Sequence, residues 1–79
     1  MIVSNSLSPK LTLYYIGSKL ISILKNERFG VTDSYILFEK LLEETNERIS
    51  FTHYMYALNW LYLLDLVKLD DNGDIRRCF

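Results

Sequence analysis

Residues 50–79 read SFTHYMYALNWLYLLDLVKLDDNGDIRRCF and predict a helix followed directly by a β-hairpin. Ser50 is a favoured N-cap residue, and the apolar residues after it predict a helix that continues to about Leu64. Asn72-Gly73 is the strongest short-range hairpin signal, because both residues tolerate positive φ. We expect strands over 66–69 and 75–78 on either side of 70–74. Asp65 is expected to take a left-handed conformation between helix and hairpin.

Another helix is predicted near the start of the chain. It begins with Ser8 as the N-cap and Pro9 at the first helical position, and it runs to about Lys25. Gly17 lies beside the apolar stripe of this helix, where the absence of a side chain allows a close neighbour. The stripe itself consists of Leu13, Ile16, Leu20 and Leu24.

The middle of the chain predicts a short strand over 28–31 and a further helix. Thr32 and Asp33 can cap the start of that helix, and the turn 46–48 ends it. Its predicted buried stripe is Tyr35, Phe38, Leu41 and Leu42. Residues 1–79 are therefore expected to form a single domain that is mainly α with a small β-hairpin. The order of three helices and a C-terminal β-wing is winged-helix-like.

The helix after Ser50 is apolar on two sides. At 100° per residue, the predicted core stripe is Phe51, Tyr54, Met55, Leu58, Leu61 and Tyr62. Tyr56, Trp60 and Leu63 fall on the opposite side, together with His53 and Asn59. Either the first helix or the N-terminal segment covers this second stripe, or another polypeptide does. We favour the second interpretation and predict a partner-binding surface at Tyr56, Trp60, Leu63, His53 and Asn59, since tyrosine and tryptophan dominate interface energetics.

The same helix is a poor candidate for reading DNA. A recognition helix needs Arg, Lys, Asn or Gln at base edges, and here only Asn59 and His53 qualify. The hairpin carries a modest basic set, Lys68, Arg76 and Arg77, which are candidate nucleic-acid contacts. A few phosphate contacts give only weak, salt-sensitive binding, so direct DNA contact is expected to be weak or absent. These cations can equally lie on a solvated strand edge or pair with acidic residues of a partner.

The composition limits both the partners and the location. The 79 residues have a formal net charge of −1, which argues against a general attraction to nucleic acid or to an acidic membrane. Hydrophobic residues make up 49% of the chain, which is more than so small an interior needs, so some are expected to meet another protein. The single cysteine, Cys78, cannot form an internal disulfide. With no apolar run of about 20 residues and no signal-peptide pattern at the N-terminus, a cytoplasmic protein without membrane contact is expected.

The sequence offers little for catalysis. His53 is the only histidine, and near the start of a helix it is better explained as a capping or surface residue than as a general base. One histidine and one cysteine do not make a zinc site, and no glycine-rich phosphate loop is present. The aspartates around Asn72-Gly73 lack the bidentate glutamate of a calcium loop. We therefore predict a noncatalytic protein with no metal, no cofactor and no small-molecule substrate.

A family resemblance lies in residues 56–70, YALNWLYLLDLVKLD, and 74–78, DIRRC. These segments resemble the small middle components of bacterial three-component ABC-ATPase systems, the group that includes Lamassu-type defence. The likeness extends to Ser8-Pro9-Lys10 and the first helix, so it covers most of the chain. Asp65 stands where many winged helices have glycine, a departure that bears on turn geometry.

The resemblance implies an adaptor role. Such a subunit would dock on an SMC-like or RecN-like ATPase and help to hold or position an effector, often a nuclease, in antiphage or antiplasmid defence. The residues agree on three points: no candidate active site, few cations and an excess of apolar surface. Two alternatives remain open, a winged-helix DNA-binding transcriptional regulator and an antitoxin-like inhibitor of a partner toxin.

Overall fold

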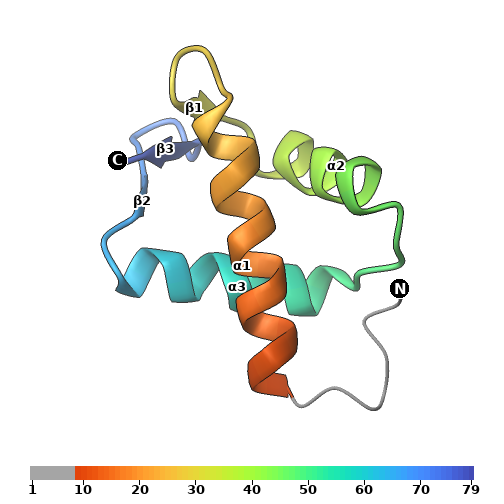
Figure 1. The fold of residues 1–79 in the computed structure, drawn as a ribbon. Coiled ribbons are helices and arrows are strands. Elements are labelled where there is room, and N and C mark those ends of the chain that lie inside the picture. Colours follow the sequence, from red (N-terminus) through yellow and green to blue (C-terminus); the bar gives the residue numbers. More distant parts are fainter. Residues whose placement is uncertain (1–8) are drawn as a thin grey trace.

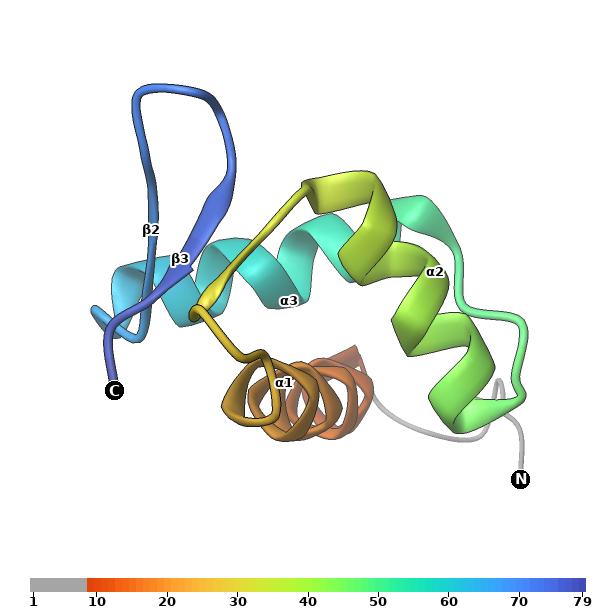
Figure 2. The same ribbon diagram turned by 90° about the horizontal axis from the view of Figure 1, so that it is seen from above.

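The computed structural model describes residues 9–79, with the side chains of residues 12–79. This part of the chain is mainly helical, with a small antiparallel sheet, and α1 crosses α3 while α2 and the sheet lie on either side of the crossing (Figures 1 and 2). The elements follow in the order α1 (Pro9–Lys25), β1 (Val31–Thr32), α2 (Ser34–Thr45), α3 (Phe51–Leu63), β2 (Val67–Leu69) and β3 (Ile75–Arg77). The predicted helices and the C-terminal hairpin are therefore confirmed.

The sheet has the order β1-β3-β2. Lys68 of β2 lies opposite Arg76 of β3, and Val31 of β1 lies opposite the same arginine on the other side. The first strand was predicted over 28–31, and this placement is wrong by about two residues. The segment before Val31 forms a turn instead, in which the Gly30 N–H bonds to the Glu27 carbonyl at 3.3 Å and Gly30 has φ 69°. Phe29, in this turn, is 82% exposed.

N-cap side chains fix where α2 and α3 begin. The Asp33 carboxylate accepts hydrogen bonds from the backbone N–H groups of Tyr35 and Ile36, and the Ser50 hydroxyl accepts one from that of His53. The predicted caps Asp33 and Ser50 are confirmed, and each satisfies helix donors that have no partner within the helix. Thr32, also predicted as a possible cap, lies in β1 instead. Asp65 has φ 63°, which confirms its left-handed conformation. The predicted Ser8 cap lies outside the described residues.

The hairpin turn differs from the prediction in one respect. Gly73 has φ 82°, but Asn72 does not have positive φ. The Asp70 carboxylate accepts hydrogen bonds from the N–H groups of Asn72 and Asp74, and the Gly73 N–H bonds to the Asp70 carbonyl at 3.0 Å. Because the aspartate organises a longer loop, only one residue needs the left-handed region.

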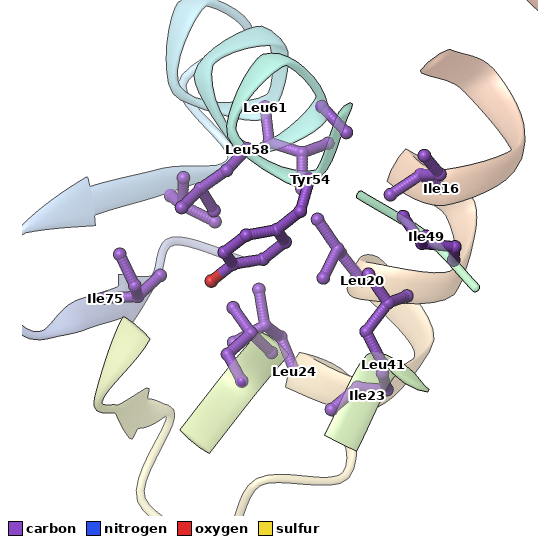
Figure 3. Close-up of a cluster of buried hydrophobic side chains, with 13 residues drawn as sticks. Ile16, Leu20, Ile23, Leu24, Leu41, Ile49, Tyr54, Leu58, Leu61 and Ile75 are labelled. Carbon is purple, nitrogen blue, oxygen red and sulfur yellow. The ribbon is translucent and has the colours of Figure 1, made fainter. Parts of the chain in front are cut away.

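The core lies where the three helices meet the sheet. Figure 3 shows the Tyr54 ring pointing into this cluster, among residues of α1 and β3. The Tyr54 hydroxyl donates to the Ser34 carbonyl at 2.8 Å, and burial raises the pKa of this phenol. The predicted α1 stripe is confirmed at Ile16, Leu20 and Leu24. The buried apolar residues are Ile16, Leu20, Ile23, Leu24, Leu37, Leu41, Ile49, Tyr54, Ala57, Leu58, Leu61, Val67 and Ile75.

Two predicted stripes are correct only in part. On α2, Leu41 is buried, and Phe38 and Leu42 are partly buried against the core as predicted. On α2 the buried residues are Leu37 and Leu41, and Tyr35, which was predicted to be buried, is 70% exposed on the opposite side and stacks on Phe51. On α3 the buried side is set by Tyr54, Ala57, Leu58 and Leu61. The small Ala57 is fully buried among them. The prediction was therefore wrong for three residues that are 41–51% exposed: Phe51, Met55 and Tyr62.

The close approach predicted at Gly17 is confirmed. A Cβ atom at this position would lie 2.7 Å and 2.9 Å from two ring atoms of Trp60. The absence of a side chain on α1 therefore allows the indole of α3 to lie directly against the backbone. Trp60 also contacts Tyr14, with ring centroids 5.0 Å apart.

Candidate functional site

An apolar hollow lies between the first half of α1 and the exposed side of α3. Its volume is about 600 Å³. All five residues predicted to bind a partner line it, and α1 supplies the opposite wall. The lining of this α1–α3 hollow is Thr12, Leu13 and Ile16 from α1, and His53, Tyr56, Asn59, Trp60 and Leu63 from α3. None of these residues is charged.

The large side chains of the hollow differ in burial. Tyr56 is 64% exposed and Leu63 is 71% exposed. Trp60 is half-buried, because its ring rests on Gly17 and Tyr14 of α1. The interpretation that the first helix covers this stripe therefore holds in part for Trp60, while Tyr56 and Leu63 are exposed. The alternative cover, the N-terminal segment, lies outside the described residues.

Two polar residues of α3, His53 and Asn59, line the hollow. His53 is exposed, and its Nδ1 atom lies 2.7 Å from the Ser50 hydroxyl that also caps α3. Asn59 is exposed as well. Within the described part of the chain, no three His, Cys, Asp or Glu side chains come together in a way that could hold a metal ion. The hollow can bind an apolar surface and offer hydrogen bonds at its edge.

A smaller hollow lies on the other side of α3, beside the hairpin. Its volume is about 190 Å³. Met55, Leu58 and Tyr62 of α3 face Val67, Leu69 and Ile75 of the hairpin across it. Sequence reasoning missed this hairpin-side hollow because it assigned Met55 and Tyr62 to the core. Asn59 lines both hollows, so α3 forms a ridge between them.

The three candidate nucleic-acid contacts lie in different surroundings. The Nη1 atom of Arg77 donates to the carbonyls of Leu24, Lys25 and Glu27 at 2.9, 3.1 and 3.3 Å. This guanidinium therefore closes the C-terminal end of α1, where free carbonyls favour a cation. Arg76 lies 3.6 Å from the Asp70 carboxylate, and Lys68 is exposed. Lys68 and Arg76 lie opposite each other on β2 and β3, whereas Arg77 is held at the end of α1 and does not join them.

No helix within residues 9–79 combines the length and the apolar character that crossing a membrane requires. The geometry thus defines a small helical domain with a three-stranded sheet, whose most distinctive surface is an uncharged, apolar face on α3. Residues 3–78 match the family model described as ABC-three component (ABC-3C) system Middle Component 6, and the chain belongs to this family. Neither the curated proteins nor the solved structures gave a match. The predicted membership among middle components of three-component ABC systems is confirmed, and the chain is an accessory component that acts with an ABC-type ATPase and a further component.

Proposed function

We propose that this chain is a noncatalytic adaptor in an antiphage or antiplasmid defence complex related to the Lamassu type. It docks on an SMC-like ATPase through the α1–α3 hollow and helps to hold or position a nuclease-like effector. Family membership supports the accessory role, and the identity of the two partners is part of the proposal.

The observation that carries the proposal is the exposure of large apolar side chains around an uncharged hollow. Tyr56 and Leu63 are 64% and 71% exposed, and they border a concave surface rather than standing alone. Contiguous apolar surface of this kind is characteristic of protein interaction sites. Burying a charged group against it would leave that charge unpaired, so the matching surface of the ATPase is apolar as well.

The order of the elements further supports a winged-helix assignment for the fold. A strand after the first helix joins a C-terminal hairpin, and α3 occupies the position of a recognition helix. In this proposal α3 has kept that position but contacts protein, because its exposed side offers Asn59 and His53 but no Arg or Lys for base and phosphate contacts. Arg77 is engaged with α1, and Asp70, Asp71 and Asp74 lie at the hairpin tip, where they would repel phosphate.

Coexpression with the ABC-type ATPase component tests the proposal. Leu63→Glu adds a charge at the edge of the hollow and is expected to abolish copurification, because the carboxylate would be buried without a partner. Phe29→Glu is the matched control, since Phe29 is 82% exposed in the turn before β1, away from the hollow. Copurification of Leu63→Glu at the wild-type level would contradict docking through the α1–α3 hollow.

A further inference from the structure

The exposed side of α3 has the chemistry that a self-complementary interface requires. The helix spans 13 residues and contains no Asp, Glu, Lys or Arg. A two-fold axis brings residues near it against their own copies, so a charged residue there would face a like charge. By contrast, α1 carries Lys19 and Lys25, and α2 exposes Glu39 and Glu43. Among the described helices, α3 is the one on which a second copy meets no repulsion.

Asn59 lies where such an axis would pass. It is exposed and lines both hollows, so it marks the top of the ridge that α3 forms between them. Its amide has both donors and an acceptor and can pair with the same amide of a second copy. A single asparagine at the contact between two helices is a known means of fixing their register.

The side chains around Asn59 are arranged to fill the hollows of a second copy. Tyr56 precedes Asn59 by three residues and Leu63 follows it by four, so an antiparallel pairing of two α3 helices places one copy's Tyr56 near the other's Leu63. A cavity of about 150 Å³ can hold a benzene molecule. The α1–α3 hollow, at about 600 Å³, has room for several side chains of that size.

We propose that the free chain forms a symmetric dimer in which two α3 helices pair antiparallel, with the two Asn59 side chains at the axis. The dimer covers the exposed apolar face before assembly. On the basis of the proposed function, the ABC-type component and the second copy compete for the same face of α3. The chain therefore leaves its dimer when the complex forms.

A charge-swap experiment on the full chain tests the dimer without any other component. Asn59→Asp and Asn59→Lys each place like charges at the axis, and each is expected to raise the dimer dissociation constant about tenfold or more in sedimentation equilibrium. An equimolar mixture of the two variants is expected to form a heterodimer at a concentration where each alone is monomeric. Phe29→Glu is the control and keeps the wild-type dimer. Far-UV circular dichroism verifies that each variant is folded.

Three results would overturn the dimer. One is a wild-type chain that stays monomeric up to its highest soluble concentration. Another is a mixture of Asn59→Asp and Asn59→Lys that remains monomeric although each variant has lost the dimer, which would indicate a contact away from a two-fold axis. The third is association that continues beyond two copies. Loss of copurification with the ATPase component is a separate result, so a failure of the proposed function and a failure of the dimer can be told apart.

Discussion

Gly17→Ala tests whether the close contact between α1 and the Trp60 ring determines the packing of the two helices. The added Cβ would lie 2.7 Å and 2.9 Å from two ring atoms, which is closer than non-bonded carbon atoms approach. The indole is not free to swing away, because it is half-buried and also contacts Tyr14 of α1. The alanine therefore forces a shift of the ring or of α1 itself.

The expected net effect is a loss of stability. Overpacking a well-packed site costs up to about 3 kcal/mol, while alanine gains about 1 kcal/mol over glycine within a helix. The difference, up to about 2 kcal/mol, lowers the melting temperature of a domain of this size by up to roughly 8–16 °C. Ser22→Ala, at an exposed position of the same helix, is the control and is expected to change stability slightly in the opposite direction.

Urea denaturation of four chains measures this effect: wild type, Gly17→Ala, Trp60→Leu and the double variant. If the clash is with the indole, Gly17→Ala is destabilising in the wild-type background and neutral or stabilising in the Trp60→Leu background. The coupling free energy is expected to be up to about 3 kcal/mol, because the helix-propensity gain is common to both backgrounds and only the overpacking cost differs. A Gly17→Ala chain that is more stable than wild type, with no coupling to Trp60, would refute the reasoning.

Two further predictions concern buried polar contacts. Arg77→Met removes the donor to three carbonyls at the end of α1 and is expected to cost about 2–3 kcal/mol in urea denaturation, with Arg77→Lys recovering only part of it; equal stability of all three chains would contradict this role. Burial raises the pKa of Tyr54 above its ordinary value of 10.0, so the folded chain keeps the phenol protonated where the unfolded chain ionises it. The resulting contribution to stability is complete below pH 10 and decreases as the pH rises beyond it. Tyr54→Phe is expected to lower stability at neutral pH by about 1 kcal/mol, through loss of the bond to Ser34, and to reduce the decrease at high pH. An unchanged pH dependence in Tyr54→Phe would contradict the raised pKa.

The features predicted correctly from the sequence depend on residues close together in the chain. Asp33 and Ser50 cap helices through backbone groups two or three residues away, and Asp65 takes its left-handed conformation within a single linker. Such signals need no knowledge of the rest of the fold. The hairpin was predicted for the same reason.

The features that were missed depend on residues far apart in the chain. On α3 the small Ala57 is fully buried while the larger Met55 and Tyr62 are exposed, and a count of large apolar residues cannot show this. Arg77 bonds to carbonyls about 50 residues earlier, so its local sequence resembles a solvated strand. The α1–α3 hollow was predicted only in part: its α3 residues were named from the helical period, but the wall from α1 appears only when the two helices cross.

The central claim, that the α1–α3 hollow is the docking face, is tested most directly by the affinity of the purified chain for the ABC-type ATPase component. Tyr56 is 64% exposed, so Tyr56→Ala removes little from the core, whereas Trp60→Ala would also disturb the packing on Gly17. Tyr56→Ala is expected to weaken binding by about 2 kcal/mol or more, roughly 30-fold in the dissociation constant, as for an interface hot spot. Phe29→Ala, at a still more exposed aromatic outside the hollow, is expected to leave the dissociation constant unchanged. Equal dissociation constants for the wild type and Tyr56→Ala would contradict the claim.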